Sequence, residues 1–364
     1  MSASDRAAAF KENRDRKINR EYGDLEEPNK RLKALVSLPE DAPVPEIVPY
    51  AYRSFDQQRI IKDVRIVSFI RPELWRAHGP DQVYLTSLLT KILGVGPAAT
   101  VAGDVPDLDH FSGRGGKDVI PLWRDAAATV PNIVGGLLDT LSAQYGETIA
   151  PEDLYAYAYA VLGSPAYTES FAEELSIPGP RLPITKDHAL FRRAVELGRW
   201  LIGLHTYGER FGGSVPRGTA RIEKAIPDTL DGYPEDYSYD PAEKTLKVGE
   251  GEIRPVQPEV FNYSVSGLEV VKSWLGYRKK NPTGRKSSPL DEIRPERWTG
   301  DMTRELLELL WVLEATVEKA PELAELLAEI TSSEVFTAEE LPEPTEEERK
   351  PPKIEVETGQ DKFC

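Results

Sequence analysis

The chain has 364 residues, of which 40% are hydrophobic, so it can build one large folded domain or two to three smaller ones. Its formal net charge of -16 argues at first sight against a nucleic-acid partner, because phosphate neutralisation requires Lys and Arg. The single cysteine, Cys364, excludes a disulfide framework and a cysteine metal cluster. No stretch has the roughly 20 apolar residues of a membrane span, so we expect a soluble, cytoplasmic protein.

The charge is unevenly distributed. Residues 334–364 contain ten acidic and four basic residues in a Pro-rich run, which predicts a disordered acidic tail over 331–364. Residues 272–297 contain eight basic and three acidic residues. Local potential, rather than the total charge, decides what can dock, so a nucleic-acid partner stays possible.

The N-terminal part changes character near residue 50. Residues 1–49 are charged and lack clear periodicity, which predicts a short helix or arm followed by a Pro-rich linker. Residues 50–130 are rich in β-formers: the stretch RIIKDVRIVSF fits one or two strands, and the later Gly and Pro residues predict short strands joined by tight turns.

Residues 131–225 have a helical pattern, with one ambiguous stretch, DLYAYAYAVLG. Alternation of Tyr155, Tyr157 and Tyr159 suits a strand or an aromatic ladder for stacking bases. However, Pro151 favours the first turn of a helix and Gly163 can end it, so we predict a helix whose tyrosines belong to the core. A second amphipathic helix is predicted within 186–211.

The C-terminal half alternates between predicted β and helical segments. Residues 226–260 predict a turn-rich β insertion, and residues 261–330 a basic loop followed by two helices, the second beginning at Pro321. The expected class is therefore α+β: mostly helical with β-rich insertions, one large domain over 50–330 and the acidic tail.

Several catalytic motifs are missing from the sequence. The nearest candidate for a phosphate-binding loop, GRGGKD at 113–118, has the wrong Gly spacing, and no G-x-S-x-G elbow occurs. Asp107, Asp109 and His110 lie close enough to suggest a metal site, but three or four converging ligands are needed and no second cluster is visible. Local capping and surface exposure are the better interpretation of these residues.

Three stretches offer DNA-contacting residue types. Arg53, Gln57, Gln58 and Arg59 can make bidentate contacts to base edges, although Arg53 and Asp56 can instead form an ion pair that fixes the turn. Arg114 and Lys117 in the glycine-rich turn can meet a phosphate, or the turn is a plain surface turn. The third is a basic, aromatic loop that is either a phosphate-binding loop or a solvated one; its cations are Arg278, Lys279, Lys280, Arg285 and Lys286.

Six ordered stretches resemble the C-terminal part of type ISP restriction-modification enzymes, over roughly residues 50–330. They are PYAYRSFDQQRI, QVYLTS, PDLDHFSGRGGKDVIPLWRDA, PEDLYAYAYAVLGSPAY, PRLPITKDHALFRRAVELGRWLIGLH and VSGLEVVKSWLGYRK. In that family one long polypeptide carries a nuclease, a helicase-like motor, an adenine N6-methyltransferase and, last, a target-recognition domain. This chain resembles the last of these.

The resemblance implies a recognition module for double-stranded DNA, not an enzyme. The methyltransferase motifs are absent, so we expect no catalysis by this chain alone and no cofactor in it. S-adenosylmethionine is expected in a partner polypeptide of the same system that carries methyltransferase and helicase-nuclease functions. Two alternatives stay open: a protein-interaction scaffold without DNA binding of its own, and a remnant of a larger enzyme.

Overall fold

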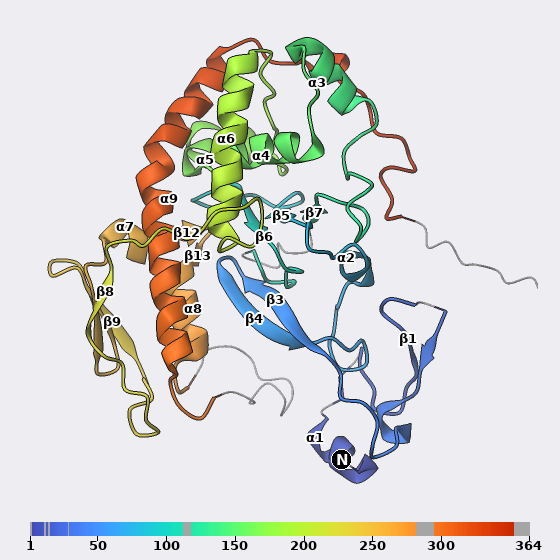
Figure 1. The fold of residues 1–364 in the computed structure, drawn as a ribbon, viewed down its shortest axis with the longest axis vertical. Coiled ribbons are helices and arrows are strands. Elements are labelled where there is room, and N and C mark those ends of the chain that lie inside the picture. Colours follow the sequence, from blue (N-terminus) through green and yellow to red (C-terminus); the bar gives the residue numbers. More distant parts are fainter. Residues whose placement is uncertain are drawn as a thin grey trace, which may run out of the picture.

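The computed structural model describes residues 2–10, 12–13, 15–27, 29–111, 118–281 and 295–352. It is an α+β fold, as expected, in which helices and several small sheets pack together (Figure 1). The long helix α9 (Gly300–Ser332) runs down one side of the molecule, with α6 (His188–His205) beside its upper half. The glycine-rich turn and most of the basic loop lie outside the described residues.

The N-terminal part forms more structure than the predicted arm and linker. It contains α1 (Ala3–Ala9) and a two-stranded ribbon of β1 (Tyr22–Gly23) and β2 (Arg31–Leu32). A short 3₁₀ turn follows at Leu35–Ser37. The next strand, β3 (Ile47–Arg53), begins inside the predicted linker and pairs antiparallel with β4 (Asp56–Ile61).

The β-rich stretch then adds a small sheet. After α2 (Pro72–Arg76), the antiparallel strands β5 (Tyr84–Ser87), β6 (Ala99–Ala102) and β7 (Val119–Pro121) pair in the order β6-β5-β7. Residues 62–69, the second half of the stretch predicted as one or two strands, form turns and irregular structure instead. All four residues of β5 and of β6 are buried, so this sheet lies inside the domain.

The helical region is confirmed by α3 (Leu137–Tyr145), α4 (Pro151–Leu162), α5 (Pro165–Ser170) and α6. The three tyrosines of α4 are buried, as the core interpretation predicts. Tyr155 donates to the Ile120 carbonyl at 2.7 Å and Tyr157 to the Pro183 carbonyl at 2.8 Å. Tyr159 bonds to Nδ1 of His205 at 2.6 Å, so each hydroxyl is satisfied inside the core.

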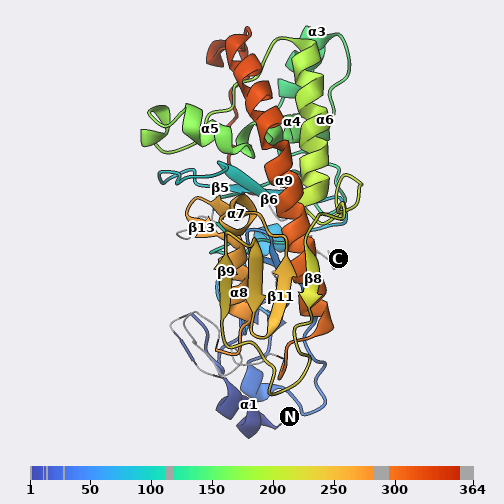
Figure 2. The ribbon, with the colours of Figure 1, turned by 90° about the vertical axis from the view of Figure 1, so that its left-hand side faces the viewer.

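The β insertion forms a four-stranded antiparallel sheet in the order β8-β11-β10-β9, which stands beside the lower half of α9 (Figure 2). Its strands are β8 (Arg221–Lys224), β9 (Tyr237–Asp240), β10 (Thr245–Val248) and β11 (Gly251–Arg254). Strand β8 falls within the range predicted to be helical, because its partner β11 lies about thirty residues later and local pattern does not reveal that pairing. The helix α7 (Pro258–Phe261), the short strands β12 (Ser264–Val265) and β13 (Leu268–Glu269), and the helix α8 (Val270–Arg278) follow.

The prediction of two C-terminal helices is wrong, because α9 continues through Pro321. Proline lacks an N–H and usually interrupts a helix. Here Pro321 is exposed, while the buried stripe continues from Leu313 before it to Leu323 and Leu327 after it. The first half of α9 packs in one apolar cluster and the second half in another, so burial along the whole length stabilises a single helix that joins both clusters.

The segment predicted as a disordered tail packs on the domain as far as it is described. The Phe336 N–H donates to the Ile184 carbonyl at 2.9 Å, and Lys186 pairs with Glu334 at 2.7 Å. Further along, Arg124 donates to the Glu348 carbonyl at 3.1 Å. Acidic composition alone does not reveal these distant partners. No helix in the described ranges is long and apolar enough to cross a membrane.

Candidate nucleic-acid interface

The β3–β4 hairpin carries the first group of candidate residues, and its tip is anchored in the core. The turn residue Phe55 has a φ of 63°, and its ring lies edge-on to His205 at 4.8 Å between centroids. The Phe55 carbonyl accepts a hydrogen bond from the Tyr207 hydroxyl at 2.8 Å, and Ser54 donates to the His110 carbonyl at 2.9 Å. Because the tip is buried, the positions of β3 and β4, which meet at the tip, are fixed.

Arg53 is held inside the protein, and its partner differs from the one the sequence suggests. Its guanidinium pairs with Asp107 at 2.7 Å, rather than with Asp56 across the turn. It also donates to the Tyr277 hydroxyl at 3.2 Å and lies 3.9 Å from the centre of the Tyr52 ring. Burial opposes the charge of Arg53, but Tyr52 and Asp107 outweigh it and raise the pKa of the guanidinium. Arg53 therefore positions the hairpin and does not offer a free cation.

Arg278, predicted as part of the basic loop, is also internal. It ends α8, is 7% exposed, and pairs with Asp56 at 2.8 Å. It also approaches Glu305 of α9 at 3.5 Å, and its guanidinium lies 3.9 Å from the Trp274 ring. Arg53 of the hairpin thus bonds to Tyr277 of α8, and Arg278 of α8 pairs with Asp56 of the hairpin. We call these two contacts the double clamp.

Beside this double clamp lies an open, polar hollow of about 540 Å³. Its walls come from the hairpin, the end of α8, the beginning of α9 and three loops. The lining residues are Pro49, Gln57, Gln58, Arg59, Glu209, Tyr233, Tyr277, Arg278, Pro295, Thr299, Asp301, Met302 and Glu305. The hollow brings together two groups that the sequence separates by more than two hundred residues, the Arg53–Arg59 stretch and the start of the basic loop.

Three of the four residues predicted to read bases line this hollow. Gln57 lies opposite Ala51 and Arg59 opposite Pro49, so these two side chains share one face of the hairpin, whereas Gln58 lies on the other. Arg59 is exposed and has no hydrogen-bond or ion-pair partner within the described ranges. Gln57 donates only a long hydrogen bond, at 3.4 Å, to Glu209. Both side chains are available to a ligand.

The hollow also contains carboxylates that sequence analysis missed. Glu209, Asp301 and Glu305 line it alongside the cations Arg59 and Arg278. Burial raises the pKa of Glu305, although Arg278 opposes the shift. No motif marks these three residues, because they come from the loop after α6 and from the first turns of α9. Carboxylates accept hydrogen bonds from the amino groups of bases and repel phosphates, so the hollow suits base edges better than the sugar-phosphate backbone.

The remaining predicted cations fall into two groups. Lys280 pairs with Glu235 at 2.8 Å on the surface, and half-buried Lys279 has no ion-pair partner among the residues described. Arg114, Lys117, Arg285 and Lys286 lie outside the described residues. Lys279 is therefore the available cation at this end of α8.

The Asp107–His110 stretch is structural in its contacts. Asp107 pairs with Arg53, accepts a hydrogen bond from Tyr50 at 3.1 Å and caps the Asp109 N–H at 2.9 Å. His110 is fully buried, and burial lowers its pKa to about 4. No group of three or more potential ligands is suited to a metal ion among the residues described. The local-capping interpretation therefore accounts for Asp107, whereas the expected surface exposure is wrong for His110, which lies in the core.

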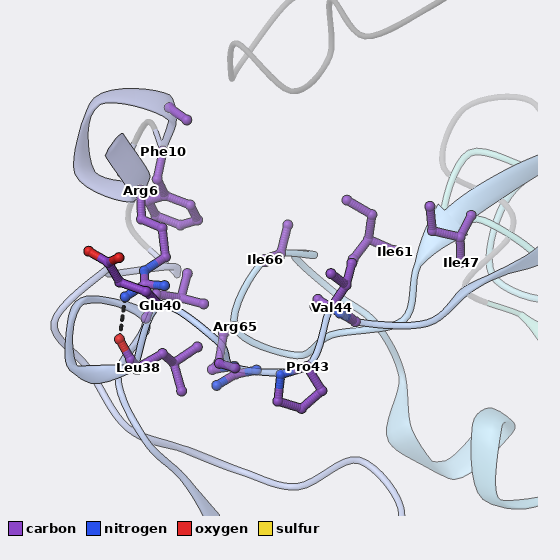
Figure 3. A pocket seen from close by; sticks show the side chains of 14 residues that line it. Arg6, Phe10, Leu38, Glu40, Pro43, Val44, Ile47, Ile61, Arg65 and Ile66 are labelled. Carbon is purple, nitrogen blue, oxygen red and sulfur yellow. Dashed lines mark hydrogen bonds between the residues drawn. The ribbon is translucent and has the colours of Figure 1, made fainter. Parts of the chain in front are cut away.

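A second hollow, of about 310 Å³, differs in character (Figure 3). It lies between α1, the Pro-rich segment and the base of the hairpin, and apolar side chains such as Phe10, Val44, Ile61 and Ile66 line it. Arg6 donates to the Leu38 carbonyl at its edge. An apolar lining offers few groups that could read a base edge, so the polar hollow is the better candidate for a nucleic-acid interface.

The fold resembles three solved structures: a DrdV–DNA complex (21% identity, TM-score 0.56), a nuclease-deletion mutant of the type ISP restriction-modification enzyme LlaGI with a DNA substrate mimic (20%, 0.51) and the ATP-dependent type ISP enzyme LlaBIII bound to DNA (16%, 0.55). The matches cover 82%, 76% and 83% of this chain. They cover only 29%, 24% and 19% of those proteins, so this chain corresponds to less than a third of each.

No curated protein matches the chain. The family described as the type ISP C-terminal specificity domain matches residues 2–309, which is most of the sequence. The chain therefore belongs to the family of type ISP C-terminal specificity domains.

Proposed function

We propose that this chain is the DNA target-recognition module of a type ISP-like restriction-modification system. It reads a short site in double-stranded DNA and positions an adenine N6-methyltransferase on it. Membership of the specificity-domain family supports the proposal, as does the fold shared with proteins that were solved with DNA. Methyl transfer, its cofactor S-adenosylmethionine and DNA cleavage belong to the partner polypeptide in this proposal.

The observation that carries the proposal is the position of exposed Arg59 and half-buried Gln57 on one rigid face of the hairpin. Glutamine pairs bidentately with adenine and arginine with guanine in the major groove. The buried tip and the clamp through Arg53 and Arg278 hold this face in place, so little conformational entropy is lost when it meets DNA. Lys279 supplies a phosphate contact at the end of α8.

The test is selection from a pool of random duplex DNA by the purified chain, with the bound fraction sequenced at low and moderate salt. We expect an enriched motif. The double variant Gln57→Ala with Arg59→Ala loses the enrichment at one or two positions, each worth about 1–3 kcal/mol of discrimination. Lys224→Ala, which removes an exposed cation from β8 outside the hollow, leaves the motif unchanged. If the double variant enriches the same motif as the wild type, Gln57 and Arg59 do not read the DNA sequence. If the wild type enriches no motif, the result favours the alternative of a protein-interaction scaffold without DNA binding of its own.

A further inference from the structure

A buried carboxyl group lies beside the two residues that we propose read bases. Asp104, which follows β6, is 6% exposed, and its Oδ2 atom is buried without a hydrogen-bond partner in the part of the chain that the structure describes. An ionised carboxylate that is buried without a partner costs free energy, and uptake of a proton removes most of this cost. The position of Asp104 therefore favours its neutral form.

The neighbouring cations leave Asp104 without an ion pair. Arg210 donates from all three nitrogens of its guanidinium to backbone carbonyl oxygens, at 2.7 to 3.1 Å. Arg59 of β4 attracts the Asp104 carboxylate only through space. Tyr84 of β5 stays neutral, because burial and Asp104 raise its pKa. Neither cation thus holds Asp104 in its ionised form by a direct contact.

Glu209 lies against the backbone next to Asp104. A Cβ added at Gly103 would lie 3.1 Å from the Oε2 atom of Glu209, and the same oxygen accepts the long hydrogen bond from Gln57. Burial raises the pKa of Asp104 to about 6, and the Glu209 carboxylate adds to this shift, whereas the two neighbouring guanidinium groups oppose it. Asp104 and Glu209 therefore form an interacting carboxyl pair, in which the buried member binds the proton.

The space around Asp104 admits a proton but no part of DNA. Asp104, Asp56 and Gln57 line a cavity of about 10 Å³ between the hairpin and β6, which holds at most one water molecule. A base edge or a phosphate therefore cannot reach the buried oxygen, and Asp104 acts on DNA through its charge. The carboxylates of the pair balance the guanidinium groups of Arg59 and Arg210 when Asp104 is ionised. Protonation of Asp104 leaves a net positive charge beside Gln57.

We infer that Asp104 is a proton switch that strengthens DNA binding at the hollow as the pH falls. The inference rests on the proposed function, which brings DNA to the face of Gln57 and Arg59. Phosphates near the carboxyl pair favour its protonated form, so the chain takes up a proton when it binds DNA. By linkage, the affinity for DNA rises as the pH falls towards the pKa of Asp104 in the free protein.

The experiment measures the affinity of the purified full chain for a fluorescently labelled, mixed-sequence DNA duplex from pH 8 to pH 6 at constant ionic strength. The wild type gains affinity several-fold, since each unit by which DNA raises the pKa of Asp104 strengthens binding up to about tenfold. Calorimetry in buffers of different ionisation enthalpy detects the uptake of up to one proton. Asp104→Asn, which has a similar size but cannot titrate, removes both effects.

The matched control is Glu305→Gln, because Glu305 is another carboxyl group of the hollow whose pKa burial raises. This variant keeps the pH dependence and the proton uptake. Persistence of the pH dependence in Asp104→Asn, or its loss in Glu305→Gln, overturns the inference. Urea unfolding at pH 7 establishes that each variant is folded.

A second variant tests the pair without changing a buried side chain. Glu209 is exposed, and Glu209→Gln removes a negative charge that raises the pKa of Asp104. The rise in DNA affinity therefore begins at a lower pH than in the wild type, and an unchanged profile overturns the pair. Selection from random DNA separates this inference from the proposed function. An enriched motif with an affinity independent of pH sinks the switch alone, whereas no DNA binding at any pH sinks both.

Discussion

Arg278 and Asp56 form an ion pair with 2.8 Å between nitrogen and oxygen, across 222 residues of sequence, and both are almost fully buried. The pair fixes α8 against the hairpin that carries Gln57 and Arg59. Arg53 reaches in the opposite direction, to Tyr277 of α8. Two arginines that the sequence presents as DNA contacts thus hold together the surface that we propose contacts DNA.

Replacing Arg278 by Met tests this clamp. The variant leaves the Asp56 carboxylate buried without its cation, and breaking such a pair costs about 3–5 kcal/mol of unfolding free energy. Urea denaturation at pH 7 measures the loss. Lys280→Met is the control, since it breaks the exposed pair with Glu235 and changes the midpoint little. A similar small effect at both positions would mean that the buried pair does not stabilise the hairpin.

The crossing of α4 and α6 depends on Gly198. A Cβ at this position would lie 1.8 Å from the Ala156 carbonyl oxygen, a backbone atom of the facing helix. Gly198→Ala therefore forces the helices apart and lowers the unfolding free energy by about 1–3 kcal/mol or more. Gly300→Ala is the matched control at the start of α9, where nothing lies within 4 Å of the added Cβ and stability is unchanged or higher. Thermal or urea unfolding measures the stability of both variants. A Gly198→Ala protein as stable as the wild type would contradict the close crossing of α4 and α6.

Acid is expected to destabilise the fold through two buried histidines. Burial lowers the pKa of His205 to about 3 and that of His110 to about 4, below the ordinary value of 6.5. The unfolded chain therefore binds more protons than the folded one below pH 6.5, and stability present above that pH is lost as the pH falls. For each group the loss at pH 5 is about 2 kcal/mol. Asp104 opposes this with about 1 kcal/mol, because burial and Glu209 raise its folded pKa to about 6.

The contacts of His205 explain why it stays neutral. The Thr316 hydroxyl donates to the Val312 carbonyl at 2.7 Å, so it accepts from the Nε2–H of His205 at 2.8 Å. Nδ1 then accepts from the Tyr159 hydroxyl. Urea unfolding at pH 7 and pH 5 measures the pH dependence, which His205→Gln reduces by about one proton per molecule. An equal slope in His205→Gln and the wild type would exclude His205 as a source of acid sensitivity.

The sequence predicts elements whose signals are local, and misses contacts whose partners are distant. Pro151 and Gly163 bound α4 as expected, since capping preferences act within one turn. The partners of Arg53 and Arg278 lie 54 and 222 residues away, so no pattern near them shows that both are internal. At Pro321 the local signal itself is wrong: proline predicts a helix boundary, but burial of the helix on both sides of it outweighs this preference.

The carboxylates of the hollow give the last prediction. Asp301 and Glu209 line the hollow with Arg59, and each places a negative charge near a bound DNA backbone. Neutralising both, with Asp301→Asn and Glu209→Gln, is expected to raise affinity for non-specific duplex DNA several-fold at low salt, because charge repulsion is removed. The same variant broadens the selected motif, since carboxylates that accept hydrogen bonds from base amino groups discriminate among bases. Fluorescence anisotropy over a salt series and sequencing of the selected pool measure the two effects.

Glu243→Gln, at the β9–β10 turn outside the hollow, is the control for this prediction. If the double variant binds DNA more tightly but selects the same motif, the two carboxylates only repel phosphates and do not read bases. If its affinity for DNA is unchanged, DNA does not bind at the hollow.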